Sequence, residues 1–326
     1  MILNRFIFRY NSAMEYKESA NSMKFANTTK STKPAGAGAK SKSKSKSTGF
    51  SKQSIAVFIF FILSVTVFAQ ENTPLYFGNP SKASSDLFAE NAEENYLMEK
   101  KQFSMSYNNK TLEANWVAWH LCATDIGDSG RSNKFIPDQS LPSEWYKVKK
   151  EDYQYNAYGF DRGHICPSAD RTATSEDNQA TFLMTNMIPQ SPDCNRITWK
   201  NLESYERELA LSGNELYIFA GPVGSGGTSG RGYFDEIKLE NNERSIKVPE
   251  FCWKIILILP EGEDDISRIT QDTHVISVCV PNRQGCHVAG DWDIYKCSIN
   301  YIEEITNFDF FDILPDDLEE YLEEKQ

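Results

Sequence analysis

The chain has 326 residues, 40% of them hydrophobic, which is enough for one large domain or two ordinary ones. It carries 34 Lys and Arg against 46 Asp and Glu, a net charge of −12. A negative net charge opposes non-specific attraction to any polyanion, so the composition argues against a pure nucleic-acid-binding module. A nucleic-acid partner would require a local basic cleft and a divalent cation to overcome this repulsion.

The first 69 residues differ from the rest in composition. Residues 23–53 are rich in Lys, Ser, Thr, Gly and Ala, which bury too little apolar surface to fold. The apolar run 55–68 follows this basic stretch and is shorter than the about 20 residues that a membrane-spanning helix needs. The pattern predicts a basic low-complexity lead plus a signal peptide over 1–69, with cleavage after Ala69 and a secreted or periplasmic protein. An uncleaved signal that anchors the protein in the membrane is the alternative.

Cleavage after residue 69 makes the remaining chain more acidic. Residues 70–326 hold 23 basic and 44 acidic residues, a net charge of −21, and no stable membrane association is expected of them. All seven cysteines lie in this part, an odd number that leaves at least one thiol unpaired. Because none of them forms a C-x-x-C pair, a zinc site of the usual spacing is not indicated.

The predicted elements indicate a single α+β domain over 93–326, preceded by a polar linker at 70–92. Its strands are predicted from β-branched and aromatic runs at 115–121, 215–221, 252–260 and 274–281. A helix is predicted at 198–213, where Leu202, Tyr205 and Leu209 form one apolar stripe and Gly213 ends it. Two more helices are predicted at 299–307 and 315–324, the last of them exposed.

The segment Asp161–His164 reads DRGH and combines an acid, a cation, a glycine and an imidazole. A surface ion pair between Asp161 and Arg162, with His164 packed in the core, explains the same residues when the motif is taken alone. An imidazole near its unperturbed pKa is suited to proton transfer at neutral pH. His164 is therefore a candidate general base.

Asn195, Glu203 and Arg207 are spaced to share one broad face of the predicted helix. Steps of eight and twelve residues, at about 100° each, turn a side chain by about 80° and 120° from Asn195. Glu203 and Arg207 are also an i, i+4 pair. A capping asparagine and an ordinary surface salt bridge explain these residues if the helix stands alone.

Taken together, the two segments resemble the DNA/RNA non-specific endonucleases of the ββα-metal type. DRGH is followed by "NMIPQSPDCNRITWKNLESYEREL", and the strings "GNELYIFAGPVGSGG" and "VPEFCWKIILILP" extend the likeness to about residues 95–320, as in the cyanobacterial and Bacteroidetes branch. The resemblance implies an α+β, ββα-metal (His-Me finger) nuclease fold, with a central antiparallel sheet flanked by helices.

Roles for three residues follow from the resemblance. His164 matches the general base that takes a proton from the attacking water. Asn195 matches the one direct protein ligand of a hydrated Mg²⁺, for which Mn²⁺ is an expected substitute. Glu203 matches the carboxylate that orients the waters of the ion.

Four further residues match supporting positions of the family. Arg162 and Arg207 match cations that hold phosphate oxygens in the transition state. Arg131 matches another phosphate-contacting arginine, and Asn186 matches a supporting polar residue near His164. Asp161 is expected to shape the strand. Cys166 and Cys194 flank His164 and Asn195, and a bond between them or two free thiols are both open.

The resemblance implies a secreted, Mg²⁺-dependent, sugar-non-specific endonuclease that hydrolyses DNA and RNA and leaves 5′-phosphate ends. Contacts to the backbone alone carry no sequence information, in keeping with a non-specific enzyme. The alternative is a catalytically inactive or differently specific phosphodiester-binding domain of the same fold. A toxin with an inhibitor or immunity protein as partner is a further interpretation.

Overall fold

The computed structural model describes residues 72–240 and 242–325. The predicted lead and signal peptide, 1–69, lie outside the described residues. Within the described ranges, no helix is long and apolar enough to cross a membrane.

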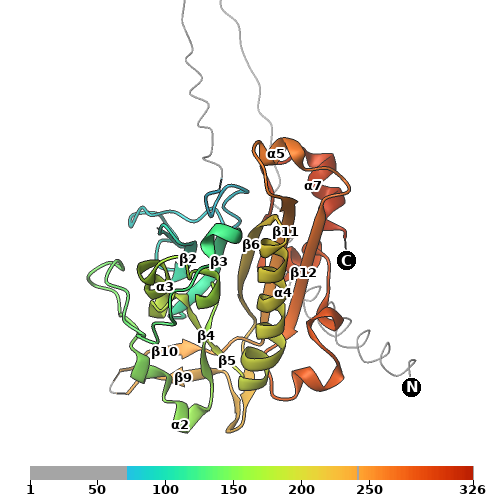
Figure 1. The fold of residues 1–326 in the computed structure, drawn as a ribbon. Helices are drawn as coiled ribbons and strands as arrows, with labels where there is room; N and C mark the ends of the chain where they lie inside the picture. The colour runs from blue at the N-terminus through green and yellow to red at the C-terminus, as the bar shows by residue number, and fades with distance from the viewer. Residues whose placement is uncertain (1–71, 241, 326) are drawn as a thin grey trace, which may run out of the picture. The chain divides into compact units, whose positions relative to one another are not determined.

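A six-stranded sheet in the order β1-β2-β3-β6-β11-β12 forms the centre of the fold (Figure 1). Every neighbouring pair is antiparallel. The strands are β1 (Tyr96–Glu99), β2 (Ser104–Asn108), β3 (Glu113–Leu121), β6 (Asn214–Val223), β11 (Phe251–Pro260) and β12 (His274–Pro281). The four predicted strands are confirmed as β3, β6, β11 and β12. The sequence analysis missed β1 and β2, whose short polar runs lack the β-branched residues that mark a strand.

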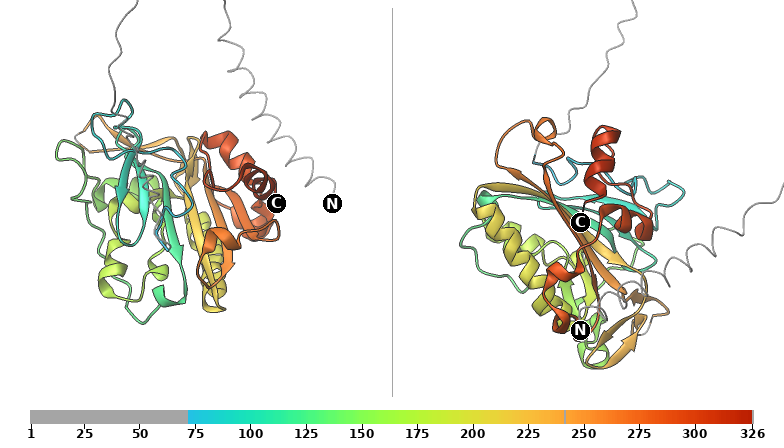
Figure 2. Two further views of the ribbon diagram at one scale, coloured as in Figure 1. Left: turned by 90° about the horizontal axis from the view of Figure 1, so that it is seen from above. Right: turned by 90° about the vertical axis from the view of Figure 1, so that its right-hand side faces the viewer.

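Each face of this sheet buries its own hydrophobic cluster, because side chains alternate between the faces along a strand. One face packs against α4 (Lys200–Leu211), which contributes Leu202 and Ala210. The other packs against α6 (Ile299–Thr306) and α7 (Asp316–Glu323), which contribute Ile299 and Leu322 (Figure 2). The prediction that the last helix is exposed was wrong on this side, since Leu322 is fully buried.

The segment 72–92 belongs to the fold, contrary to the prediction of a linker over 70–92. Tyr76 and Phe77 are buried in the second cluster, and the Phe77 ring meets the Tyr217 ring edge-on at 4.5 Å. Ser84 forms a parallel bridge with Tyr96. Although the segment is mostly polar, its buried aromatic residues pack it against the sheet.

A second, smaller unit combines two antiparallel strands with a helix. β4 (Asp161–His164) pairs with β5 (Met187–Gln190), with Asp161 opposite Gln190 and His164 opposite Met187. A π-helix, Cys194–Trp199, then leads into α4. Only glycine fits at position 163, because a Cβ there would lie 2.2 Å from the Gln190 Oε1 atom. This arrangement is the ββα unit that the DRGH motif predicted.

The remaining elements are short and lie around these two units. The helices are α2 (Tyr155–Tyr158), α3 (Ser175–Ala180) and α5 (Asp265–Arg268), with single 3₁₀ turns at 123–125, 150–153, 168–170, 184–186, 286–289 and 292–295. The strands are β7 (Gly227–Ser229), β8 (Gly232–Phe234), β9 (Glu236–Lys238) and β10 (Ser245–Lys247), paired as β7-β8 and β9-β10.

A buried ion pair fixes α4 on the sheet. The Lys254 Nζ atom, on β11, lies 2.9 Å and 3.2 Å from the two carboxylate oxygens of Glu206 on α4, and both side chains are fully buried. The same ammonium lies 4.5 Å from the centre of the Trp199 ring. Burial raises the pKa of Glu206, and the Lys254 charge opposes that rise. Each charge therefore depends on the other for its place in the core.

We expect Lys254→Met to lower the free energy of unfolding by about 3–5 kcal/mol, because it leaves the Glu206 carboxyl buried without its partner. The double variant Lys254→Met/Glu206→Met should recover most of this loss. Urea denaturation measures both. The matched control is Lys82→Met, which removes the exposed partner of Asp309 and should cost less than about 1 kcal/mol. A loss in Lys254→Met no larger than the control's would contradict the assignment.

Candidate active site

Asn195 lies in the π-helix that precedes α4, as the predicted helix start suggested. The hydrogen bonds of a π-helix span five residues, so its turn is wider than that of an α-helix. The rotation of 100° per residue assumed for Asn195, Glu203 and Arg207 therefore does not hold for 194–199. Such widened turns occur frequently at functional sites.

Asp161 connects the strand β4 to this widened turn. Its Oδ2 atom accepts hydrogen bonds from Asn195 Nδ2 and Arg196 Nε, both at 2.8 Å. Its Oδ1 atom accepts one from Arg196 Nη2 at 2.6 Å. The hydrogen bond from Nδ2 to the carboxylate orients the amide of Asn195, which leaves the Oδ1 atom available to bind a cation. This arrangement fits the prediction that Asn195 supplies the one neutral oxygen ligand of Mg²⁺. Asp161 thus positions Asn195. The sequence had predicted only that Asp161 shapes the strand.

His164 is buried at the end of β4, and its Nε2 atom has no hydrogen-bond partner among the described residues. The ring lies against two phenyl rings, 4.7 Å from that of Phe182 and 5.6 Å from that of Phe135. Burial, with the nearby charges of Arg131 and Arg162, lowers the pKa of His164 to about 3. The imidazole is therefore unprotonated at neutral pH, and it is a weaker base than the unperturbed imidazole that the sequence predicted.

Two arginines share those phenyl rings with His164. The guanidinium carbon of Arg162 lies 4.5 Å from the centre of the Phe135 ring, and that of Arg131 lies 5.0 Å from the centre of the Phe182 ring. The Nε atom of Arg162 is buried without a partner in the described part of the chain. Arg131 donates to Asn133 Oδ1 and Ser168 Oγ. In the described part of the chain neither arginine forms an ion pair with a carboxylate, and two such cations beside a neutral imidazole suit the binding of an anion.

On α4, Arg207 pairs with a residue that the sequence analysis missed. Its Nη1 atom lies 2.9 Å from Asp170 Oδ1, and Asp170 is fully buried and also accepts from Trp119 Nε1 at 3.1 Å. Among the described residues Arg207 therefore forms its ion pair with Asp170, in place of the i, i+4 surface salt bridge with Glu203. Burial raises the pKa of Glu203 to about 8, against the opposing charge of Lys254. A bound cation would restore the charge of this carboxyl.

Asn186 supports the motif through the backbone and does not touch the imidazole. Its side chain accepts from Cys166 N at 2.9 Å and donates to the Cys166 and Thr181 carbonyls, each at 2.9 Å. Its own carbonyl accepts from Ile165 N at 3.0 Å. Fully buried, Asn186 fixes the two residues that follow His164.

Comparison with known proteins places this arrangement in a family. A family model described as DNA/RNA non-specific endonuclease matches residues 82–317. The chain belongs to this family. A protein from Nostoc sp. named "Nuclease" is 43% identical over 251 residues, which cover 77% of this chain and 85% of that protein. "Nuclease C1" from Cunninghamella echinulata var. echinulata is 28% identical, over 74% of this chain and 88% of its own.

A solved structure shows the same fold. "Crystal structure of the EndoG/EndoGI complex: Mechanism of EndoG inhibition" matches with a TM-score of 0.58 and 21% identity, over 75% of this chain and 92% of that chain. The resemblance drawn from the DRGH motif, including its cyanobacterial branch, is confirmed, and so is the ββα-metal fold.

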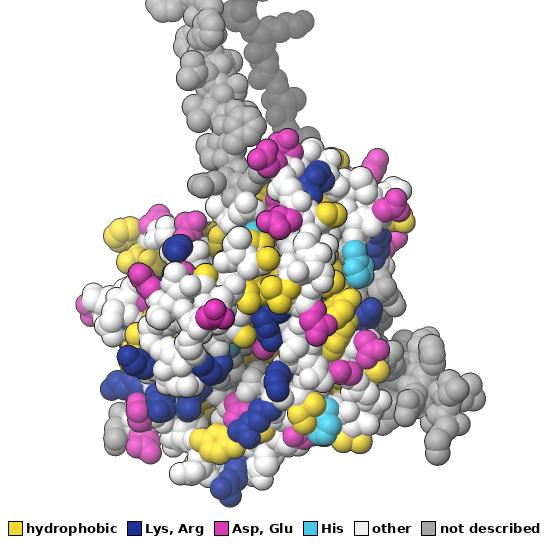
Figure 3. Space-filling view, in the orientation of Figure 1, with side chains coloured by type: hydrophobic (Ala, Val, Ile, Leu, Met, Phe, Trp, Pro, Cys, Tyr) yellow, Lys and Arg dark blue, Asp and Glu magenta, His cyan; other side chains and the backbone are white. Residues whose placement is uncertain are grey.

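The surface around the family motif is basic in spite of the acidic composition. In Figure 3, Lys and Arg side chains gather over the lower part of the face, where Figure 1 draws α2, β4 and β5. Asp and Glu side chains stand along the upper edge and on the right of the same view. The local basic surface that an acidic chain needs for a polyanion lies over the ββα unit.

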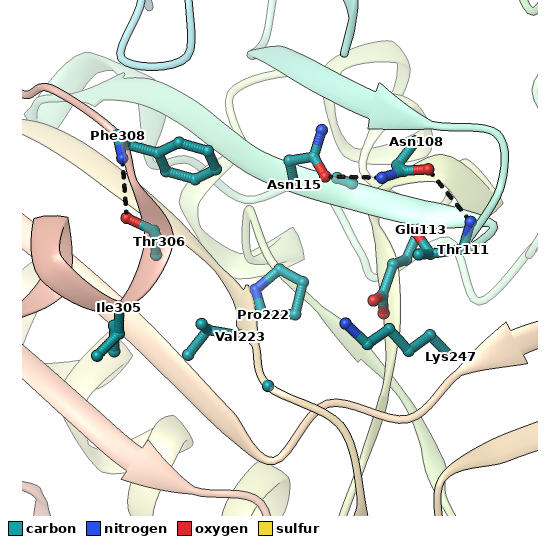
Figure 4. A pocket seen from close by; sticks show the side chains of 12 residues that line it. Asn108, Thr111, Glu113, Asn115, Pro222, Val223, Lys247, Ile305, Thr306 and Phe308 are labelled. Atoms are coloured by element: carbon teal, nitrogen blue, oxygen red, sulfur yellow. Dashed lines mark hydrogen bonds between the residues drawn. The ribbon is translucent and has the colours of Figure 1, made fainter. Parts of the chain in front are cut away.

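A cavity of about 260 Å³ lies elsewhere, between the start of β3, the end of β6, β10 and the end of α6 (Figure 4). Glu113 and Lys247 point toward one another in it. Burial raises the pKa of Glu113 to about 8. None of the motif residues lines this cavity. We therefore place the candidate active site at the ββα unit, which carries the motif residues.

All seven cysteines are free thiols. Cys166 and Cys194 are therefore not bonded to one another, which decides between the two alternatives left by the sequence. Cys194 contacts Gln190, whose Nε2 atom lies 3.4 Å from its Sγ atom and 3.7 Å from that of Cys252. Burial raises the pKa of the Cys166 thiol, which keeps it protonated and poorly nucleophilic beside the motif.

The lowered pKa of His164 predicts a specific acid sensitivity. Between pH 6.5 and about 3, the unfolded chain binds a proton at this histidine that the folded chain does not. Stability is therefore lost as pH falls through this window, by up to about 1.4 kcal/mol for each pH unit. We expect His164→Gln to lose less stability than the wild type between pH 7 and pH 5 in urea denaturation. Equal losses in the two proteins would show that the imidazole titrates normally in the fold.

Proposed function

We propose that this protein is an endonuclease that hydrolyses phosphodiester bonds of both DNA and RNA, with DRGH and the start of α4 as its active site. The observation that carries the proposal is the buried, neutral His164, whose Nε2 atom has no partner among the described residues and which lies near the charges of Arg131 and Arg162. Membership of the family and the nuclease names of the relatives support the same reaction.

In the proposed reaction, His164 Nε2 accepts a proton from the water that attacks phosphorus. The bond from phosphorus to the 3′ oxygen breaks and this oxygen takes a proton from a second water, which leaves a 5′-phosphate and a 3′-hydroxyl. Arg131, Arg162 and Arg207 hold the phosphate oxygens as charge develops on them. Arg207 keeps its direction through Asp170, and Arg131 and Arg162 keep theirs through the phenyl rings.

Asn195 Oδ1 would hold Mg²⁺, with Glu203 orienting the waters of the ion, and Mn²⁺ is proposed as a substitute. When bound, the ion supplies positive charge at the scissile phosphate and the leaving oxygen. The orientation of the Asn195 amide by Asp161 supports this assignment.

We further propose that the protein is secreted or periplasmic. The proposal rests on the basic segment that precedes the short apolar run at 55–68 and on Ala69 after it. An anchor formed by an uncleaved signal is the alternative. The EndoG structure was solved as a complex with EndoGI, described as a mechanism of inhibition, and this supports a protein inhibitor as a partner of the present chain.

The activity is tested with the purified wild type and His164→Ala, each incubated with supercoiled plasmid and with ribosomal RNA, in Mg²⁺ or in EDTA. We expect the wild type to degrade both substrates only with the metal, and His164→Ala to be slower by about 10²–10⁴-fold, the usual contribution of a general base. If neither protein cuts either substrate with any divalent ion, the proposal fails and the phosphodiester-binding interpretation takes its place.

The role of Asp161 is tested through the metal. In Asp161→Asn, the amide of Asn195 loses its charged acceptor, so we expect the Mg²⁺ concentration for half-maximal cleavage to rise about 10–100-fold, with a small change at saturating metal. The matched control is Arg196→Gln, which removes the other partner of Asp161 and leaves the Asn195 contact in place. An unchanged Mg²⁺ dependence in Asp161→Asn would rule out the positioning role.

A further inference from the structure

Outside the ββα unit, the end of β3 brings three different metal-binding side chains together. His120 and Cys122 are two residues apart in extended backbone, so their side chains leave the same face of the strand. The chain then turns through a 3₁₀ helix, Ala123–Asp125, which returns Asp125 to that face. A ring nitrogen of His120, the Cys122 sulfur and an Asp125 oxygen all lie within 4.8 Å of one another.

The distance between the Cys122 sulfur and the Asp125 oxygen fits a tetrahedral ion. Zinc binds thiolate sulfur at about 2.3 Å and carboxylate oxygen at about 2.1 Å, so two such ligands at a tetrahedral angle lie about 3.6 Å apart. The Cys122 Sγ atom lies 3.6 Å from Asp125 Oδ2. Backbone contacts hold the carboxylate there, because Cys122 N donates to the same oxygen at 3.0 Å.

A carboxylate supports the imidazole of His120 from the neighbouring strand. The Nε2 atom of the ring lies 3.1 Å from Glu215 Oε2, on the neighbouring strand β6. Arg268 holds Glu215 as a carboxylate, with Nη2 at 2.6 Å from Oε1. A carboxylate only accepts hydrogen bonds, so Nε2 carries the proton and the lone pair of the ring is on Nδ1. A carboxylate behind the imidazole is the usual support of a zinc-bound histidine.

We propose that His120, Cys122 and Asp125 bind one zinc ion, separate from the catalytic metal, with a water as the fourth ligand. Nitrogen, sulfur and oxygen donors together suit Zn²⁺ and do not suit Mg²⁺, which takes oxygen ligands. Thiolate and carboxylate balance the two charges of the ion, and Thr124 Oγ1, 3.0 Å from the sulfur, donates to the thiolate.

The zinc joins β3 to the segment that serves the active site. Thr172 N and Ala173 N both donate to the Asp125 carbonyl at 3.0 Å. Arg171 donates to the His120 carbonyl at 2.6 Å, and its Nη1 atom lies 3.5 Å from Asp125 Oδ2. Asp170, which precedes Arg171 in the chain, forms the ion pair with Arg207. The ion therefore stabilises the backbone that carries Asp170 and takes no part in the reaction itself.

The test is a titration of the metal-free, reduced protein with Co²⁺ and then with Zn²⁺, free of any nuclease substrate. We expect one equivalent of Co²⁺ to give a near-ultraviolet thiolate-to-cobalt absorption band, and one equivalent of Zn²⁺ to remove it. Cys122→Ser should lose the band. Asp125→Asn keeps an amide oxygen for the Cys122 N–H and should weaken zinc at least about tenfold while remaining folded by circular dichroism.

Two controls locate the ion. Cys297→Ser changes another half-buried thiol and should keep the band, and His164→Ala should keep it as well, since the proposed catalytic metal lies elsewhere. The proposal is overturned if the wild type gives no thiolate band, if the band survives in Cys122→Ser, or if it disappears in either control. These outcomes are independent of DNA or RNA cleavage.

Discussion

The position of α4 depends on the buried pair of Lys254 and Glu206. Both side chains are fully buried, and an ion pair of this kind is costly to form and more costly to break. In the observed packing of α4 on β11, Glu206 faces the ammonium, which lies 4.5 Å from the centre of the Trp199 ring. Arg207 then points to Asp170, and the widened turn at Asn195 comes against Asp161. The geometry of the candidate site therefore follows from the packing of the core and not from local contacts alone.

The aromatic residues around His164 explain how one small region combines a neutral imidazole with two arginines. Phe135 and Phe182 remove water from the imidazole, which disfavours its charged form. The faces of the same rings hold Arg162 and Arg131, and within the described ranges neither cation forms an ion pair with a carboxylate. A carboxylate partner would neutralise the arginines and raise the pKa of the imidazole. The phenyl rings hold the arginines in place without either effect.

The sequence predicted the parts of this structure that local pattern determines. Four sheet strands, the helix that Gly213 ends at a φ of 89°, and the motif residues were found from periodicity, turn residues and family spacing. The partners of those residues were not found, because Asp170 and Arg207 meet only after the chain has folded, and no spacing rule links them. The burial of Phe77 was also not predicted, because the segment 70–92 around it is polar in composition. A straight helix was assumed at 194–199, where tertiary contacts impose a π-helix.

An acidic chain can bind a polyanion where its acidic side chains lie away from the binding surface. Charges on a protein surface are screened beyond about 8 Å at physiological ionic strength. In Figure 3 the Asp and Glu side chains at the upper edge stand apart from the lower part of the face, where Lys and Arg gather. The long-range field still repels nucleic acid, so it slows the approach of the substrate more than it weakens the final contact. Binding then depends on a few phosphate contacts at the site, which carry no sequence information and suit an enzyme that acts without base preference.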